Sequence, residues 1–247
     1  MTKFVMRLAG VKVEVHALHE STKDFCAGWL CDGPAHERVV LQQANIDAER
    51  VRAARSDERR GQEPRPYSDA YLETLALYRK VAEALLAHDA VVFHGCVLAV
   101  DGRAYAFTAP SGTGKTTHAR YWLKMVEGAH VLNGDKPLLR MRNGVAYACG
   151  TPWRGKEAMG VNEDFPLGGI CVLERGERPH IERGSYQAVL GMLLKQTHVP
   201  ELPQARVRCV ELVGELVMCV PLWHMWCTLD ERCALMSYQA MTGRDGR

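Results

Sequence analysis

The sequence predicts an α/β protein, a mixed β-sheet with flanking helices plus a small β-rich N-terminal segment. Three observations support this fold class. Two pairs of apolar, strand-like runs are joined by Asp101-Gly102 and Asn143-Gly144, dipeptides that favour tight hairpin turns. A strand-like run followed by a glycine-rich loop and an amphipathic helix indicates a strand–loop–helix unit. Near the start, the stretch VKVEVHAL alternates between apolar and polar residues, as half-buried strands do.

The composition is that of an ordinary globular protein. Of the 247 residues, 47% are hydrophobic and 24% are charged, which suits one large domain or one domain with a small appendage. Lys and Arg number 31 against 29 Asp and Glu, so the charge indicates neither nucleic acid nor membrane as a partner. No apolar run reaches the roughly 18 residues that span a bilayer. Nine cysteines without a C-x-x-C pair, and no recognisable export signal, favour reduced thiols and a cytoplasmic protein.

Residues 1–66 are predicted to form the small β-rich segment, and residues 67–247 the main domain. Short strands and turns are expected up to about residue 46. Residues 47–66 hold six arginines among five acids. They form either a patch for an anionic ligand or a solvated loop or frayed helix, and the mixed signs favour the second. Ser68 is then expected to cap a helix extending to about Ala87. The predicted buried stripe of that helix is Tyr71, Leu75, Tyr78, Ala82 and Leu85.

The best-defined hairpin lies at the centre of the chain. Strands over residues 91–100 and 103–109 flank Asp101-Gly102, and a type I′ turn needs positive φ at both of those positions. Counting back from the turn pairs Val100 with Arg103. Continuing that register places His94 opposite Ala109, so His94 is expected beside the loop that follows the second strand.

The remaining elements are assigned in chain order. HVLNGD is a short strand, and the flanks of Asn143-Gly144 form a second hairpin. GGICVLER and HIERGS, joined by GERP, are predicted to form a third hairpin. Residues 185–197 are expected to be helical, VPLWHMWCT a late strand and DERCALMSYQAM a closing helix. The helix after the glycine-rich loop has a predicted buried stripe of Ala119, Trp122, Leu123 and Val126.

The stretch APSGTGKTTHARYW, from Ala109 to Trp122, carries the strongest functional signal. It matches the end of the phosphate-binding pattern G-x-x-x-x-G-K-[ST], with Ala109 in place of the first glycine. Glycines permit the close approach that lets backbone N–H groups and a helix N-terminus bind phosphate. Lys115 is expected to reach the β- and γ-phosphates, and Thr116 to hold Mg²⁺. With ATP and Mg²⁺ as the expected ligands, the predicted nucleotide-binding residues are Ser111, Gly112, Thr113, Gly114, Lys115, Thr116 and Thr117. The alternative is a glycine-rich turn at a helix start that binds nothing.

Three stretches occur in the order and at the spacing of a known family: HGCVLAVDG (94–102), SGTGKTT (111–117) and VLNGDKP (131–137). In these, the sequence resembles the HPr kinase/phosphorylase family and, more remotely, the ATP-dependent phosphoenolpyruvate carboxykinases. GTPWRGKE (150–157) and ICVLERGE (170–177) look like an HPr-kinase-related bacterial branch. The resemblance covers residues from about 90 to 240 and implies a P-loop core of mixed β-sheet.

The resemblance implies roles for individual residues. His94 matches the active-site histidine of the family and Lys115 its phosphate-loop lysine. Thr116 matches the metal-binding hydroxyl, and Asp135 the acid that is implied to act as general base.

The sequence departs from the family at two places. Gly134 stands where the family has the first acid of an Asp-Asp pair. Pro152-Trp153-Arg154-Gly155 lacks the glutamate of the family's Glu-x-Arg-Gly stretch, which leaves Glu157 or water to take its place.

The residue chemistry fits phosphoryl transfer without the family. Such transfer needs in-line positioning, Mg²⁺ on the phosphates, cations on the transferring group and a base for the attacking hydroxyl. Asp135, at a strand end, is predicted to be that base or, with Thr116, a metal ligand. Arg154 and Lys156 are candidates to neutralise the phosphoryl group, and ordinary surface charge is their alternative. His118, His198 and His224 are interpreted as structural.

The leading hypothesis is an ATP-dependent kinase that transfers the γ-phosphoryl group to a hydroxyl. The acceptor is a protein or peptide serine, or a small molecule. Two alternatives remain: a carboxykinase-like enzyme acting on a small carboxylic acid, and a non-catalytic nucleotide-binding regulatory module. A homo-oligomer is left open.

Overall fold

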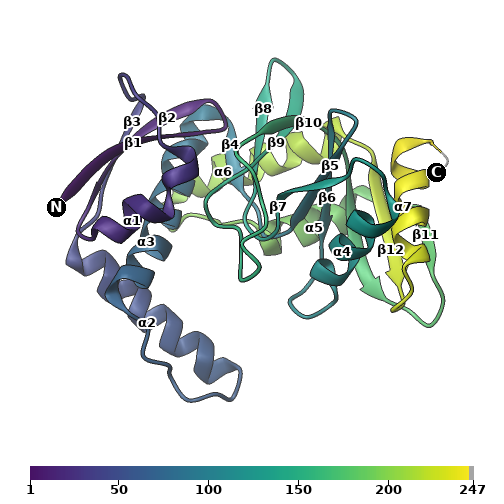
Figure 1. Ribbon diagram of the computed structural model, residues 1–247, viewed down its shortest axis with the longest axis horizontal. Coiled ribbons are helices and arrows are strands. Elements are labelled where there is room, and N and C mark those ends of the chain that lie inside the picture. Colours follow the sequence, from purple (N-terminus) through teal and green to yellow (C-terminus); the bar gives the residue numbers. More distant parts are fainter. Residues whose placement is uncertain (245–247) are drawn as a thin grey trace. The chain divides into compact units, whose positions relative to one another are not determined.

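The computed structural model describes residues 1–244, which fall into two compact units, Met1–Leu85 and a second that begins at Leu86 (Figure 1). The protein is a mixed α/β protein with a small three-stranded sheet in the first unit and a nine-stranded sheet in the second. The unit boundary falls later than residue 66, where the sequence placed it.

The N-terminal unit contains the strands that its alternating pattern predicts. β1 (Thr2–Leu8) pairs antiparallel with β2 (Val11–Ala17), and β2 pairs parallel with β3 (Glu37–Val40). In β2 every second side chain is buried, from Val11 to Ala17, because successive side chains point to opposite faces of a sheet. The short helices α1 (Glu20–Phe25) and η1 (Ala27–Trp29) were not predicted.

The arginine-rich stretch is an ordered helix, α2 (Gln43–Arg59), rather than a loop or frayed helix. A capping box formed by Gln42 and Asn45 begins it. Two of the five acids of this stretch turn inward: Glu49 and Asp57 are each only 1–2% exposed. Glu49 pairs with Arg52 and Arg79, and Asp57 with Arg65. Several arginines therefore hold the unit together by neutralising buried carboxylates.

Helix α3 (Asp69–Ala84) begins at the predicted cap, where the Ser68 hydroxyl accepts a hydrogen bond from the backbone N–H of Tyr71. The predicted face is partly wrong, because Tyr71 is 48% exposed while Leu72 and Leu77 are fully buried. The buried carboxylate of Glu73 accepts hydrogen bonds from the N–H groups of Leu18 and His19. These bonds tie α3 to the N-terminal unit and explain why the boundary follows it.

The second unit is built on one mixed sheet in the order β4-β8-β9-β10-β6-β5-β7, to which β12 adds beside β10, and β11 beside β12. Strands β6, β10 and β12 are parallel to one another, and the other pairings are antiparallel. The strands are β4 (Ala90–Val92), β5 (Cys96–Val100), β6 (Arg103–Thr108), β7 (His130–Asn133), β8 (Leu138–Arg142), β9 (Val145–Cys149), β10 (Asp164–Arg175), β11 (His180–Arg183) and β12 (Leu222–Cys227).

Two of the three predicted hairpins are confirmed. Val100 pairs with Arg103 across Asp101-Gly102, and Arg142 pairs with Val145 across Asn143-Gly144. All four turn residues have positive φ, between 50° and 77°, as a type I′ turn requires. The third prediction is wrong, because β11 pairs with β12 and not with β10. β12 arrives some forty residues later in the chain and takes the place beside β10.

Helices cover both faces of this sheet (Figure 1). α4 (Lys115–Met125) and α7 (Arg232–Thr242) share one hydrophobic core, which contains Trp122 and Met225. α5 (Tyr186–Gln196) and α6 (Pro203–Cys219) lie over the other core. Helix α6 was not predicted. In α4 the predicted stripe is confirmed except for Leu123, which is 41% exposed.

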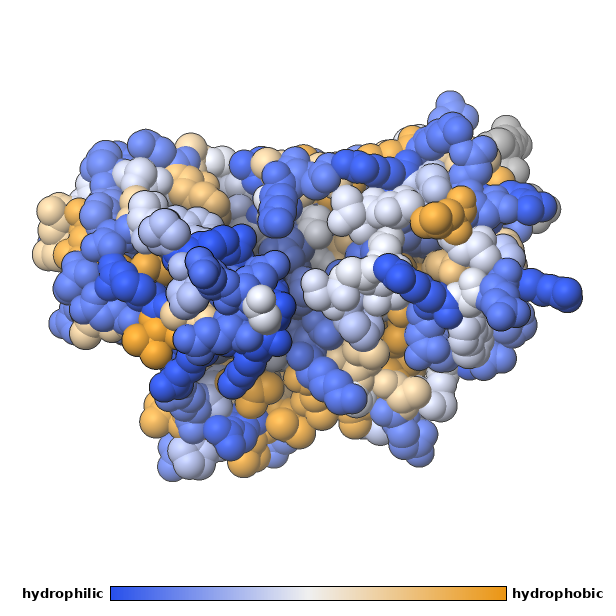
Figure 2. All heavy atoms as spheres, turned by 90° about the horizontal axis from the view of Figure 1, so that it is seen from below, coloured by the Kyte–Doolittle hydropathy of each residue, from blue (hydrophilic) through white to orange (hydrophobic). Residues whose placement is uncertain are grey.

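Hydrophilic residues cover most of the face drawn in Figure 2, and hydrophobic residues gather toward its lower border. Helix α6 leaves Val207, Val210 and Met218 exposed. Among residues 1–244, none of the helices has the length and apolar character needed to cross a membrane.

A buried polar contact joins α4 to α7. The Ser237 hydroxyl donates to the carbonyl oxygen of Ala234 and accepts a hydrogen bond from the indole N–H of Trp122. His118 Nε2 lies 3.0 Å from the same hydroxyl oxygen. Because the hydroxyl proton is already donated, His118 must donate from Nε2 and be the neutral tautomer with a proton there. This supports the structural interpretation of His118.

Burial lowers the pKa of His118 to about 3. In the unfolded chain an imidazole binds its proton near pH 6.5, so between these values the unfolded state holds more protons. The free energy of unfolding should therefore fall with decreasing pH across this window, by up to about 1.4 kcal/mol per pH unit from this group. His118→Gln keeps a side-chain donor and should flatten that slope in urea unfolding measured from neutral to acid pH. The exposed His180→Gln serves as control, and an unchanged slope in His118→Gln would contradict the buried neutral imidazole.

Candidate functional site

The glycine-rich loop joins the end of β6 to the first turn of α4, as predicted. Gly112 and Gly114 have φ of 82° and 121°, a region that side chains with a Cβ rarely adopt. A Cβ added at either position would meet nothing within 4 Å. The backbone conformation, and not crowding, is therefore what requires glycine at these two positions.

Lys115 folds back over the loop that precedes it. Its Nζ donates to the carbonyl oxygens of Ala109, at 2.9 Å, and Pro110, at 3.3 Å. Burial lowers the pKa of Lys115, and the nearby carboxylate of Asp135 acts in the opposite direction. The side chain is half-buried rather than solvated, and its charge lies within electrostatic reach of Asp135.

The other predicted nucleotide-binding residues surround the same helix start. Ser111, Gly112 and Thr116 are exposed, and Thr113, Gly114 and Thr117 are half-buried. Thr116 lies in the first turn of α4, where backbone N–H groups have no partner within the helix. On the other side of the loop, the guanidinium of Arg175, the last residue of β10, donates to the carbonyl oxygen of Gly112 at 2.6 Å.

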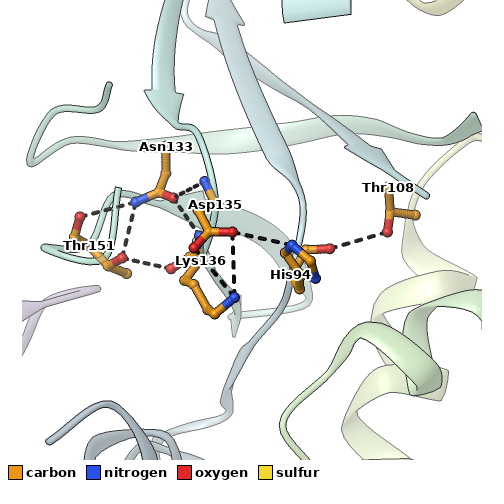
Figure 3. A network of polar contacts seen from close by, with 6 residues as sticks. All are labelled: His94, Thr108, Asn133, Asp135, Lys136 and Thr151. Atoms are coloured by element: carbon orange, nitrogen blue, oxygen red, sulfur yellow. Dashed lines mark hydrogen bonds and ion pairs between the residues drawn. The ribbon is translucent and has the colours of Figure 1, made fainter. Parts of the chain in front are cut away.

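His94 and Asp135 form a pair beside this loop (Figure 3). His94 Nε2 lies 3.2 Å from Asp135 Oδ1, and Lys136 Nζ lies 3.4 Å from Asp135 Oδ2. The β5–β6 ladder ends at Cys96 and Phe107, so the predicted His94–Ala109 pairing does not form. Instead the backbone N–H of His94 donates to Gln196, and the Thr108 hydroxyl donates to the carbonyl oxygen of His94.

The ladder ends there for a physical reason. A Cβ added at Gly95 would lie 2.3 Å from the ring of Phe93 and 2.7 Å from the carbonyl oxygen of Phe107, and the N–H of Gly95 donates to the carbonyl oxygen of Asp135. The chain has thus turned from β6 toward the segment that follows β7. This turn brings His94 to Asp135, a contact that the extended register did not predict.

The electrostatic surroundings keep Asp135 ionised. Burial raises the pKa of its carboxyl group, but the hydrogen bond from His94 and the charges of Lys136 and His94 outweigh that effect. The pKa therefore lies below its ordinary value. At neutral pH the group is a carboxylate, which can accept a proton or bind a cation.

Asn133, the last residue of β7, positions Asp135 and was missed in the sequence. Its side-chain oxygen accepts hydrogen bonds from the backbone N–H groups of Asp135, at 2.9 Å, and Lys136, at 2.8 Å (Figure 3). Its amide nitrogen donates to the carbonyl and the hydroxyl of Thr151. Asparagine before a turn commonly bonds the backbone two residues on, so the stretch VLNGD carried a usable signal.

Asn133→Ala should destabilise the C-terminal unit. The side chain is fully buried and fully hydrogen-bonded, and its removal leaves two backbone donors and Thr151 without that partner. Each unsatisfied buried group costs about 1–3 kcal/mol, so we expect a loss of about 3 kcal/mol or more in the free energy of unfolding. Urea unfolding measures this loss, with the exposed Gln187→Ala as control. A loss below about 1 kcal/mol would show that the network does not hold the turn.

The segment after Thr151 passes close to Asp135. A Cβ at Gly155, whose φ is 75°, would lie 2.9 Å from the Cβ of Asp135. A Cβ at Gly134 would lie 3.2 Å from the carbonyl oxygen of Arg154, so an acid at that position would crowd this segment. The Arg154 side chain lies along Gly160, with Cγ 3.1 Å from the position of an added Cβ.

Glu157 is engaged elsewhere. Both of its carboxylate oxygens accept from the guanidinium of Arg120 on α4, at 2.8 and 2.7 Å. This pairing weakens the idea that Glu157 replaces the missing glutamate of the resembled family.

The residues that could hold a metal are few. Across residues 1–244, no group of three or more His, Cys, Asp or Glu side chains is arranged to hold one. Mg²⁺ commonly takes only one or two protein oxygen ligands together with phosphates and water. A Thr116 hydroxyl and an ionised Asp135 carboxylate suit that preference.

Comparison with known proteins gives a limited result. No family model matches the sequence, and no curated protein matches it. Among solved structures, the HPr(Ser) kinase/phosphatase from Coxiella burnetii matches over 62% of this chain and 95% of that one, at 10% sequence identity and a TM-score of 0.38. A TM-score at this level is too low to carry an argument about function.

Proposed function

We propose that the protein is an ATP-dependent phosphotransferase, a kinase that transfers the γ-phosphoryl group to a hydroxyl, and that its second unit is a P-loop core of the HPr kinase-like kind. One observation carries the proposal. The Thr108 hydroxyl, at the end of the strand that leads into the glycine-rich loop and Lys115, donates to the carbonyl oxygen of His94, and the imidazole of His94 lies 3.2 Å from the carboxylate of Asp135. A phosphate-binding cation and a positioned base are among the parts that phosphoryl transfer requires.

The loop supplies nucleotide binding in this proposal. The N–H groups of residues 111–117 and the N-terminus of α4 face the phosphates. Lys115 exchanges the carbonyls of Ala109 and Pro110 for β- and γ-phosphate oxygens. Thr116 would hold Mg²⁺, which when bound neutralises charge on the phosphates, and metal binding by Asp135 is the alternative to its role as the base. Arg154 is the candidate cation for the transferring group.

Asp135 supplies the base. The acceptor hydroxyl oxygen forms a bond to the γ-phosphorus as the bond from that phosphorus to the bridging oxygen of ADP breaks. The acceptor proton passes to a carboxylate oxygen of Asp135. The hydrogen bond from His94 to Oδ1 orients the carboxylate. The ammonium group of Lys136 lies beside Oδ2 and fixes the position of that oxygen.

The experiment that tests this function uses ATP labelled in the γ-phosphate. Label appearing in a hydroxyl-bearing protein, serine peptide or small molecule, or slowly in water, supports phosphoryl transfer. MgATP binding in calorimetry without transfer to any acceptor would favour the non-catalytic regulatory module. Label that appears only with a small carboxylic acid would favour the carboxykinase-like reaction, and no MgATP binding at all would refute the nucleotide site.

A further inference from the structure

Different strands flank the proposed phosphate site on its two sides. β5, which follows His94, and β7, which precedes Asp135, lie on one side of β6. β10 and β12 lie on the other side. β6, β10 and β12 run parallel, so their carboxyl ends meet at the sheet edge that carries the glycine-rich loop. The bond from Arg175 to Gly112 confirms that the end of β10 reaches the loop.

This arrangement gives a bound nucleotide a direction. With the γ-phosphate at Lys115 and Asp135, the ends of β10 and β12 lie on the far side of β6 and are the direction in which we place the base. Two strand spacings, roughly 10 Å, separate β6 from β12. A ribose and its α-phosphate can bridge that distance.

Three aromatic rings lie at the end of β12 on that side. The rings of Trp226 and His224 have centroids 4.1 Å apart, and His180 stacks on Trp226 at 5.5 Å and 25°. All three share a face, because Trp226 is two residues from His224 and pairs with His180 across the ladder. Trp226 is half-buried, and the His180 side chain is 60% exposed.

Each imidazole has an acid near it, and only the contact of His180 is within hydrogen-bonding geometry. His180 Nε2 lies 3.3 Å from Glu182, and His224 Nε2 lies 3.5 Å from Glu174. Glu174 is the neighbour of Arg175, the residue that contacts the glycine-rich loop. Glu174 and Arg175 are consecutive residues of β10, so their side chains point to opposite faces of the sheet, and the ring cluster shares with the loop the carboxyl edge of the sheet rather than a face.

We propose that Trp226, with His224 and His180, forms the stacking platform for the base of the bound nucleoside triphosphate. This proposal rests on the nucleotide site proposed above and assigns to it the location of the base. It gives His224 a part in binding, where the sequence suggested a structural role. Stacking of a base on an aromatic side chain contributes about 1–3 kcal/mol.

The test compares two ligands that share a phosphate chain. The parent should bind MgATP more tightly than magnesium tripolyphosphate, which lacks a base. Trp226→Ala should raise the dissociation constant for MgATP about 10- to 100-fold and leave that for tripolyphosphate unchanged. Trp226→Phe keeps a stacking ring and should recover most of the affinity. Tyr147→Ala, an aromatic residue on β9 outside the cluster, is the matched control.

The outcomes separate this inference from the proposed function. If Trp226→Ala binds MgATP as the parent does, or if the parent binds both ligands equally, the platform is refuted and the phosphate site stands. If Trp226→Ala weakens both ligands equally, its effect is on the fold and the platform is likewise refuted. If the parent binds neither ligand, the proposed nucleotide site is refuted, and the stacking platform that rests on it is refuted as well.

Discussion

Asp135→Asn is expected to lose most phosphoryl transfer while it binds MgATP nearly as well as the parent. Asparagine keeps the size and one oxygen of the carboxylate but cannot accept the proton of the attacking hydroxyl. Proton transfer by a positioned base contributes typically about 10²- to 10⁴-fold, which is the loss expected in transfer rate. Asn133 bonds the backbone N–H groups of this turn and not the carboxylate, so the turn should persist in the variant.

Rates with γ-labelled ATP and affinities from calorimetry measure the two effects separately. Until an acceptor is found, slow hydrolysis with water as the nucleophile can replace transfer. Asp230→Asn is the control, because the carboxylate of Asp230 pairs with Arg232, the first residue of α7. Full transfer activity in Asp135→Asn would refute the base, and loss of MgATP binding would instead make Asp135 a metal ligand.

Lys115→Ala is expected to bind MgATP at least roughly 30-fold more weakly, since loss of one partner of a buried, hydrogen-bonded charge pair costs about 2–5 kcal/mol. In the ligand-free chain its ammonium group bonds two loop carbonyls, of which that of the exposed Pro110 can be taken over by water, while Ala109 is buried, so a modest loss of stability is expected. The fold should therefore survive.

Calorimetry with MgATP and thermal unfolding of the free protein measure these two effects. Lys195→Ala removes an exposed lysine of α5 and should change neither quantity. An unchanged MgATP affinity in Lys115→Ala would remove the basis for the nucleotide site. A collapse of thermal stability would show that the bonds to Ala109 and Pro110 maintain the fold rather than prepare a ligand site.

The sequence by itself determined the features that depend on a few neighbouring residues. Asp101-Gly102 and Asn143-Gly144 specified their turns, because those dipeptides tolerate the positive φ that a type I′ turn demands. Ser68 specified the start of α3 through a hydrogen bond to a residue three positions away. The glycine-rich loop between a strand and a helix was likewise recognisable, since the need for glycine at 112 and 114 arises from local φ alone.

Tertiary structure decided where these pieces meet. GERP looked like the turn of a hairpin, yet β12 pairs with β10 and buries Met225 in the core beneath α4 and α7, and this pairing is not encoded in the local turn. α3 belongs to the N-terminal unit because the carboxylate of Glu73 accepts hydrogen bonds from backbone N–H groups more than fifty positions earlier. The His94–Asp135 contact arose only because β5 stops at Cys96 and the chain turns toward the end of β7. Pattern and propensity describe neighbours in sequence, whereas burial of polar groups and strand pairing are settled by partners that are distant along the chain.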